Sequence, residues 1–258
     1  MLKQRIIPKF LLKDGRLVKG IRFHENLREA GNPVTTAKVY DSYGVDELLF
    51  LDIQATLGSR DTMLEVVERA SRDIFMPFTA GGGVRSLEDV NRLLRAGADK
   101  VSVNTAAVER PAFVREAAHR FGDQCITVTI DYRVDADGGR RVYTHGGTRR
   151  TDFDPIEWAL RMQDSNCGEV LLCSIDRDGT MAGYDIETLA KAVDRLDVPV
   201  IASSGAGSLD HCGAALTVGV SAIAIATLFL FTDHSPIKVR SALRSRGFNV
   251  RASGSSRN

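Results

Sequence analysis

An internal repeat limits the folds that this chain can adopt. Residues 77–87 return as residues 199–209, an offset of 122 residues, and in both copies a strand-like apolar run ends in a glycine-rich turn. The same offset pairs Gly97 with Gly219 and Thr105 with Thr227. Each copy is typical of a strand, a turn, a helix, a second strand and a small-residue turn. A chain of 258 residues therefore divides into two similar α/β halves.

Apolar runs alternate with helix-period segments along the chain, and the runs are continuous, as in a parallel sheet covered on both faces. Strands are expected near residues 5–12, 47–53, 76–80, 99–103, 124–131, 168–174, 198–203 and 221–226. Helices are expected near residues 33–44, 60–73, 86–96, 110–121, 154–165, 185–194, 208–218 and 235–247. Eight strand–helix pairs predict a (β/α)₈ barrel over residues 1–251, followed by a disordered tail at 252–258. A doubly wound open sheet is the alternative, but no G-x-G-x-x-G follows the first strand.

Composition excludes several classes of function. The net charge of +1 gives no support for nucleic-acid binding, and no apolar run approaches the ~20 residues of a membrane span. We expect no signal peptide, because the first residues lead directly into a short strand. No metal and no cofactor are expected. The cysteines lack metal-ligand spacing and indicate reduced thiols in a cytoplasmic protein: Cys125, Cys167, Cys173 and Cys212.

Two glycine turns are candidate phosphate sites. The first glycine turn, Gly81–Gly83, ends one strand and precedes a helix, so its backbone N–H groups suit an anion. Asn104 and Thr105 follow the next strand and add side-chain donors. The second glycine turn, Gly205–Gly207, has Ala226 and Thr227 in the equivalent place. The alternative is that these glycines only permit tight turns. Two such sites predict a substrate with a phosphate at each end.

Four carboxylates at the ends of three apolar runs are candidates for acid–base work, because partial burial there raises a pKa. These residues are Asp52, Asp131, Asp176 and Asp178. Two long connections, 13–31 and 133–149, follow the first and fifth strands on the same face. Near the starts of strands, four residues could form a ring of ion pairs at the opposite end, either for stability or as a gate: Arg5, Glu47, Lys100 and Glu169.

Together these residues resemble the HisF family, the cyclase subunits of imidazole glycerol phosphate synthase. The resemblance runs from Arg5 to Arg251 and is carried by residues 5–7, 13–20, 46–53, 97–102, 104–108, 174–180 and 248–251. It implies a (β/α)₈ barrel and a bisphosphorylated ribosyl substrate. It also implies a heterodimer with a HisH-like class I glutaminase, which docks at the charged rim and supplies ammonia.

The resemblance also implies roles for individual residues. The four rim charges match the family's ammonia gate, and Lys19 matches a loop that closes over substrate. Asp131 matches one of two catalytic aspartates. The substrate and phosphate sites match Gly83, Asn104 and Thr105 in the first half and Asp178, Gly179, Gly205, Ala226 and Thr227 in the second.

One catalytic position departs from the family pattern. The family has a Cys-Leu-Asp-Val run in the first strand, and here Lys9 and Leu11 replace its cysteine and its aspartate. A leucine transfers no proton, and loss of a positioned acid or base typically costs ~10²–10⁴-fold in rate. Asp14 lies three residues further on, in the loop, and is a poor substitute. Lys9 shares the strand parity of Leu11, so both should point inward, where Lys9 could pair with Asp52 or Asp131 or narrow the ammonia route.

An apolar residue at position 11 resembles a HisF-like subgroup associated with surface-polysaccharide (lipopolysaccharide) sugars. There the barrel is thought to pass ammonia to a separate amidotransferase that forms an acetamidino group, and we expect this diverted role for the chain. The first rival is a working cyclase in histidine biosynthesis, with Asp131 and Asp176 moving protons. Other rivals are a barrel that only activates its glutaminase and a sugar-phosphate isomerase.

Overall fold

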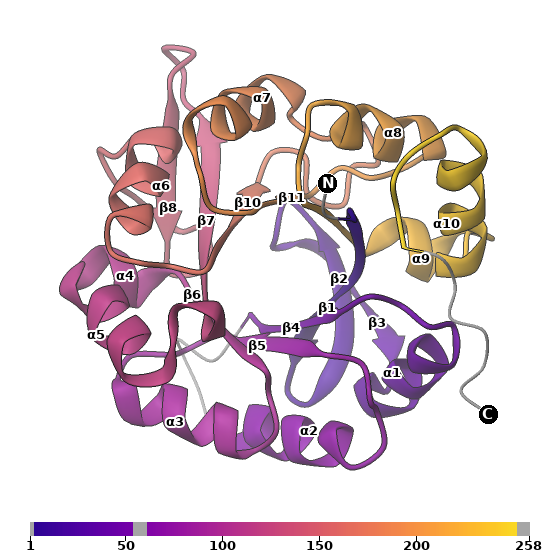
Figure 1. Ribbon diagram of the computed structural model, residues 1–258, viewed down its shortest axis with the longest axis horizontal. Coiled ribbons are helices and arrows are strands. Elements are labelled where there is room, and N and C mark those ends of the chain that lie inside the picture. Colours follow the sequence, from indigo (N-terminus) through magenta and orange to yellow (C-terminus); the bar gives the residue numbers. More distant parts are fainter. Residues whose placement is uncertain (1–2, 54–60, 252–258) are drawn as a thin grey trace.

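The structure is a computed structural model that describes residues 3–53 and 61–251. The expected tail at 252–258 and the first residue of the helix expected at 60–73 lie outside the described residues. Figure 1 shows an inner ring of strands enclosed by an outer ring of helices. This arrangement follows from the continuous apolar runs, since every barrel strand is covered on its outer face by a helix.

The sheet closes on itself. Parallel neighbours follow the order β10-β11-β12-β1-β4-β5-β6-β7, and β7 pairs in turn with β10. The prediction of a (β/α)₈ barrel is confirmed, and the open-sheet alternative is wrong. The barrel strands are β1 (Arg5–Lys13), β4 (Leu48–Asp52), β5 (Phe78–Gly81), β6 (Lys100–Val103), β7 (Ile126–Val134), β10 (Glu169–Ser174), β11 (Val200–Ser203) and β12 (Ala222–Ile225).

The helices begin where the sequence supplies caps. Ser86 and Asp89 form a capping box, and Asp154 caps a helix that has proline in its first turn. The longer helices lie close to the predicted ranges: α1 (Pro33–Ser42), α2 (Asp61–Ser71), α3 (Leu87–Arg95), α5 (Ala112–Phe121), α6 (Pro155–Gln163), α7 (Ile186–Arg195), α8 (Leu209–Thr217) and α10 (Pro236–Ser245).

Some short elements were not predicted. The short helices α4 (Thr105–Glu109) and α9 (Thr227–Phe231) follow β6 and β12, so the two halves repeat this detail as well, and the short 3₁₀ helix η1 (Asp123–Cys125) precedes β7. The connection 13–31 forms an antiparallel ribbon of β2 (Arg16–Ile21) and β3 (Glu25–Gly31). The connection 133–149 contains β8 (Arg140–Thr144), and β9 (Arg149–Arg150) follows it. A hairpin turn at residues 135–139 joins β7 to β8.

Two apolar clusters hold the barrel together. The larger cluster fills the space between strands and helices and includes Phe10, Phe50 and Trp158. The smaller cluster lies inside the barrel and consists of Ile7, Leu49, Leu171, Ile201, Ala222 and Ala224. Alternate residues of one strand face opposite sides, which is why Phe10 packs outside and Ile7 inside. The same alternation directs Arg5, Lys9 and Leu11 to the interior.

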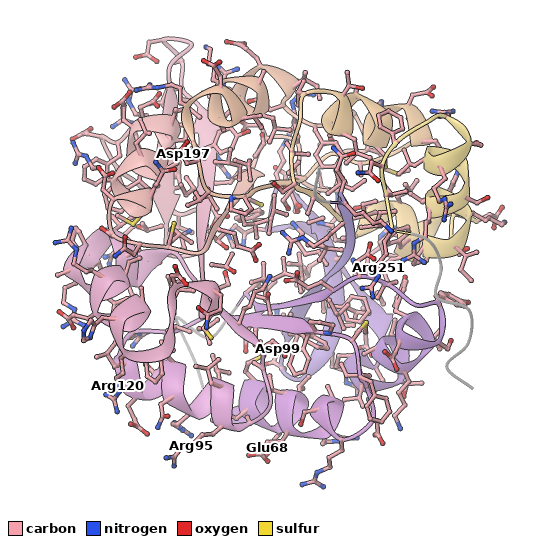
Figure 2. The ribbon with its side chains drawn as sticks, viewed as in Figure 1. Glu68, Arg95, Asp99, Arg120, Asp197 and Arg251 are labelled. Carbon is pink, nitrogen blue, oxygen red and sulfur yellow. The ribbon has the colours of Figure 1, made fainter. Side chains whose placement is uncertain are left out.

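Charged side chains cover the outside of the helix ring, as Figure 2 shows for Glu68, Arg95 and Arg120. Within residues 3–53 and 61–251, no helix is both long and apolar enough to cross a membrane.

Candidate functional site

Four charged residues form a closed ring at the amino-terminal end of the barrel. Arg5 contacts Glu47 at 2.5 Å and Glu169 at 2.8 Å. Lys100 contacts the same two acids at 3.1 and 2.7 Å. The four residues predicted as a rim ring are therefore brought together, with each base between two acids. We call them the charged ring.

Attraction between opposite charges shifts the pKa values of Arg5 and Glu169 in the charged ring. Burial alone would lower the pKa of Arg5, but attraction to Glu169 and Glu47 outweighs burial and raises that pKa. Burial alone would raise the pKa of Glu169, but Arg5 and Lys100 lower it. Hydroxyls of Thr79 and Thr127 donate to the two acids at 2.7 and 3.2 Å. The ring is thus a layer of alternating, hydrogen-bonded ion pairs across the end of the barrel.

An apolar layer lies directly above the charged ring. It is the interior cluster of the barrel, and on β1, β4 and β10 its members are the inward residues that follow the ring positions: Ile7, Leu49 and Leu171. On β1 the inward residues are Arg5 in the ring, Ile7 in the apolar layer and Lys9 above it. The barrel interior therefore changes from charged to apolar to polar along its axis.

A cavity of about 520 Å³ opens above these layers, at the carboxyl ends of the strands. The predicted first-half site lies in its wall, because Gly83, Asn104 and Thr105 all line the cavity. Arg85 and Arg149 also line it. Backbone amides at a glycine turn and nearby guanidinium groups suit a phosphate. This volume is in the range that holds small-molecule ligands.

Asp131 lies in the wall of the same cavity, at the carboxyl end of β7. Burial raises the pKa of its carboxyl from 3.8 to about 6, although Lys9 and a hydrogen bond from Asn104 act against the increase. The Asn104 amide donates to Asp131 at 2.7 Å. A carboxyl group with a pKa close to neutral pH suits general acid–base work. Asn104, which was predicted to hold phosphate, here orients the carboxylate.

Strand register shows that Leu11 occupies the position equivalent to Asp131. Leu11 pairs with Leu51 on β4, and Asp131 pairs with Cys173 on β10. Leu51 and Cys173 are related by the repeat offset of 122 residues, so their partners are equivalent too. Leu11 is 5% exposed and lines the cavity. At these two equivalent positions the cavity therefore has a carboxylate from one half of the barrel and an isobutyl group from the other, while Asp52, at the end of β4, also lines it. Asp14 is exposed at a turn, as expected.

The second-half site is almost filled. A cavity of only about 10 Å³ remains there, roughly the room for one water. The predicted residues come together around it: Lys19, Asp178, Gly179, Gly205, Ala226 and Thr227. Lys19 reaches Asp178 at 2.5 Å, and both side chains are 2% exposed. The ribbon that carries Lys19 thus places an ammonium group into the second-half site.

Lys9 points inward, as its strand parity predicts, but its partner was not predicted. Its Nζ lies 3.2 Å from Asp178 Oδ1 and donates to Ser203 Oγ at 2.9 Å. The prediction of a pair with Asp52 or Asp131 was therefore wrong, because the side chain extends toward β10 and β11. Lys9 lines both the large and the small cavity. It forms part of the wall between the two half-sites.

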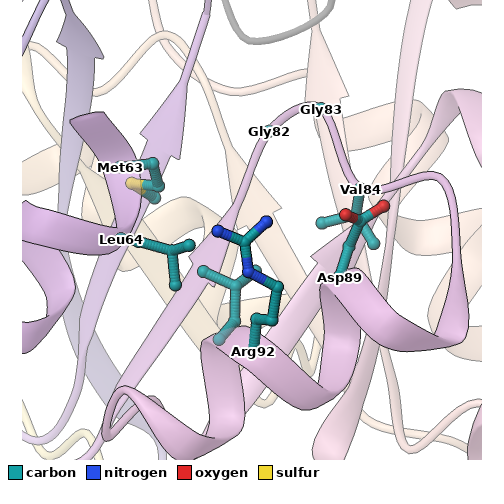
Figure 3. Close-up of a pocket in the computed structure, with 8 residues that line it drawn as sticks. Met63, Leu64, Gly82, Gly83, Val84, Asp89 and Arg92 are labelled. Carbon is teal, nitrogen blue, oxygen red and sulfur yellow. The ribbon is translucent and has the colours of Figure 1, made fainter. Parts of the chain in front are cut away.

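A separate cavity of about 30 Å³ lies behind the first glycine turn, between α2 and α3. Figure 3 shows the Arg92 guanidinium extended from α3 toward Gly82 and Gly83. Met63 and Leu64 lie on the side of Arg92 that is away from Val84 and Asp89. The turn thus has an open face at the large cavity and a packed face behind it.

The cavity wall includes residues that the sequence did not single out. Phe23 and His24 from the β2–β3 ribbon and His145 from the end of β8 line it. Their signal was only their place in the two long connections. Asp176 does not line the large cavity, because its carboxylate accepts from the Val134 amide at 2.9 Å beside an outer groove. In the described part of the chain, no group of three or more His, Cys, Asp or Glu side chains could hold a metal ion.

Fold and site together define a (β/α)₈-barrel protein whose ligand site lies at the carboxyl ends of the strands, opposite a charged ring. Comparisons with known proteins agree. The family described as "Histidine biosynthesis protein" matches residues 5–235. Imidazole glycerol phosphate synthase subunit HisF of Streptomyces coelicolor is 50% identical over 250 residues, 97% of this chain and 99% of the relative. HisF of Streptomyces avermitilis is 49% identical over the same shares. The chain belongs to the HisF family.

Proposed function

We propose that this chain is the ammonia-using barrel subunit of a two-protein enzyme and acts as an imidazole glycerol phosphate synthase cyclase in histidine biosynthesis. The observation that carries the proposal is the order of layers along the barrel axis: a charged ring, an apolar interior, and a cavity with Asp131 and a glycine turn. The name and the 50% identity of the Streptomyces coelicolor relative favour this reaction over the diverted role.

In this proposal a HisH-like class I glutaminase forms a heterodimer with the chain at the charged ring. Ammonia is small and neutral, so an apolar interior favours its passage over that of charged species. The side chains of Arg5 and Lys100 are 24% and 20% exposed, whereas those of Glu47 and Glu169 are 4% and 7% exposed. The two bases are therefore the members of the ring that a docked partner can reach.

The cavity supplies the rest of the chemistry. A bisphosphorylated ribosyl substrate places one phosphate at Gly83 and Thr105 and the other at Gly179, Gly205 and Thr227. Asp131 then lies between them, with a carboxyl whose pKa of about 6 lets it accept and return a proton near neutral pH. Lys19 must leave Asp178 for the second phosphate to enter, because the second-half site is nearly full.

A second function is favoured by one specific observation. Leu11 lies in the cavity wall where register predicts the partner of Asp131, so this position supplies no proton. A barrel that retains the charged ring but lacks this acid could pass ammonia to a separate amidotransferase that amidates a surface-polysaccharide sugar. We propose this diverted role as the alternative.

One assay separates the two functions. The purified chain is supplied with the bisphosphorylated ribosyl substrate and excess ammonium salt, and product formation is followed for the native chain and for Leu11→Asp. We expect native turnover that Leu11→Asp raises by less than about tenfold, because in a working site Asp131 already carries the proton transfer. Native turnover near background, raised ~10²-fold or more by Leu11→Asp, would contradict the cyclase proposal and favour the diverted role.

A further inference from the structure

Two buried lysines share one carboxylate at the second-half site. Lys9 contacts Asp178 Oδ1 at 3.2 Å, and Lys19 contacts Asp178 Oδ2 at 2.5 Å. All three side chains are 2% exposed. Either lysine alone would satisfy the charge of the carboxylate. The presence of two therefore requires an explanation, because each buried ammonium is costly unless it is paired.

The two lysines are held differently by the fold. Lys9 lies on β1, which is hydrogen-bonded to β12 on one side and β4 on the other, and it also donates to Ser203 at 2.9 Å. Lys19 lies on β2, whose outer neighbour β3 is largely exposed. Lys9 is thus part of the closed barrel, whereas Lys19 belongs to a ribbon at its mouth.

The electrostatic environment also makes Lys9 the more firmly held of the two lysines. Burial and repulsion from Lys9 lower the pKa of Lys19 despite its contact with Asp178. For Lys9, burial is outweighed by its neighbours Cys173 and Asp178, and its pKa is raised. The ammonium of Lys9 is the better stabilised of the two, so Lys19 is the one that can leave Asp178 more readily.

Asp178 also organises the second glycine turn. Ser204 has a φ of 81°, a left-handed conformation that is strained for a residue with a side chain, and its repeat equivalent is Gly82. The Ser204 hydroxyl donates to Asp178 Oδ1 at 3.1 Å. The carboxylate therefore holds the turn whose residues Ser204, Gly205 and Ala206 line the small cavity. A displaced Asp178 would release this turn.

We propose that Lys9 is a positioning residue that keeps Asp178 paired and in place, so that Lys19 can move from Asp178 to an anion that enters the second-half site. The inference deepens the proposed function and rests on its assignment of an anion to this site. The ligand is a phosphate group, which takes the amides of the second glycine turn and the ammonium of Lys19. Without Lys9, the same movement would leave a buried carboxylate without a cation, which is strongly unfavourable.

The test is titration of inorganic phosphate by calorimetry. It uses the native full-length chain and three variants: Lys9→Met, Asp178→Asn, and the double variant. The native chain is expected to bind two phosphates, one in each half. Lys9→Met should weaken one of the two by about tenfold or more and leave the other unchanged. In the double variant the affinity for this phosphate should return to within about threefold of the native value, because no buried carboxylate then remains without a cation. Asp178→Asn alone should bind this phosphate at least as tightly as the native chain, because Lys19 is then no longer held by a carboxylate.

Lys38→Met is the matched control. Lys38 lies on the outer helix α1 in an exposed pair with Asp73 at 2.8 Å, so its loss removes a lysine without touching the barrel. It should leave both phosphate affinities unchanged. Equal affinities in Lys9→Met and the native chain would overturn the proposal. A loss that persists in the double variant would also overturn it, because Lys9 would then act through packing or direct contact.

The proposal can still be tested if the Lys9→Met variant does not fold. If Lys9→Met fails to fold, the double variant is compared with Asp178→Asn, and affinities within about threefold are expected, whereas a tenfold difference overturns the proposal. A native chain that binds no phosphate overturns both this inference and the anion sites of the proposed function. Phosphate binding that follows the expected pattern without turnover on the ribosyl substrate contradicts the proposed reaction alone.

Discussion

The two halves of this barrel have nearly the same backbone, but their half-sites differ in the side chains and in the free space that they contain. In the first half the glycine turn opens into a cavity of about 520 Å³, but the strand that should supply a carboxylate supplies Leu11. In the second half the carboxylate of Asp131 is present, but the space at the glycine turn is reduced to about 10 Å³ by buried side chains. Each half therefore retains one of the two features that an acid–base site for a phosphorylated ligand needs.

This contrast shows that the repeat determines the secondary structure of both halves but not the side chains that fill their sites. Strand ends, turns and even the short helices α4 and α9 recur in both halves, because they depend on local sequence. Lys9 on β1 and Lys19 on the β2–β3 ribbon fill the second-half site, whereas their counterparts, β7 and the connection that follows it, bring Asp131 and His145 to the wall of the large cavity. Lys9 and Lys19 both extend to the second-half site, so one strand and its following ribbon create most of the difference.

The largest expected effect is the loss of turnover when Asp131, the carboxylate of the second half, is replaced. Asp131→Asn keeps the shape of the side chain and can still accept the hydrogen bond from Asn104, but it cannot take up a proton. We expect ammonia-dependent turnover to fall by ~10²–10⁴-fold, measured as the initial rate at saturating ammonium salt. Asp152→Asn, at a fully solvated position on the same face, is the control and should retain the native rate. A loss below tenfold for Asp131→Asn would mean that another group carries the proton.

The second effect concerns stability and pH. The pKa of Asp131 is raised from 3.8 to about 6, so the folded chain binds this proton more tightly than the unfolded chain does. The contribution of Asp131 to the free energy of unfolding therefore decreases as pH rises from about 4 to about 6, by about 2–3 kcal/mol, and stays low above that range. Asp131→Asn lacks this decrease.

Denaturant unfolding of the native chain and Asp131→Asn at several pH values between 4 and 7.5 measures this difference. We expect the variant to gain stability relative to the native chain as pH rises. For Asp152→Asn, whose side chain is 97% exposed, no comparable gain is expected. A difference between Asp131→Asn and the native chain that stays constant across this range would rule out the raised pKa.

The smallest expected effect compares the two threonines of the repeat. Thr105→Val removes a hydroxyl beside the first glycine turn, and we expect phosphate at that site to bind about threefold to tenfold more weakly in calorimetry. Thr227→Val should cost less, because the Lys19 ammonium dominates the second-half site. Losses of equal size would contradict the view that the two half-sites hold anions by different means.

Much of the fold could be predicted from local patterns. Continuous apolar runs gave the barrel strands, strand parity placed Lys9 and Leu11 in the interior, and position near the strand starts gave the four ring residues. The helices α4 and α9 have five residues each, too few for a 3.6-residue period to be visible. The ribbon of β2 and β3 was missed because the polar pattern of β3 is that of a loop.

The contacts within the site were harder to predict than the positions. Lys9 and Asp178 are separated by 169 residues, and their contact depends on how far a lysine extends across a closed barrel. Sequence reasoning placed Lys9 inside but assigned it to Asp52 or Asp131, the carboxylates closest to its own strand end. The choice of Asp178 depends on Ser203 and Lys19 as well, and no local pattern contains that information.

The composition of the charged ring has a consequence for the ancestry of the fold. Register makes Glu47 and Glu169 equivalent, whereas Arg5 and Lys100 have Cys125 and Ala222 as their counterparts. A symmetrical protein made by duplicating the second half would face two acids across the axis with no base between them. One made by duplicating the first half would crowd surplus bases around the same two acids. Balanced charge at this end of the barrel therefore requires that the two halves differ.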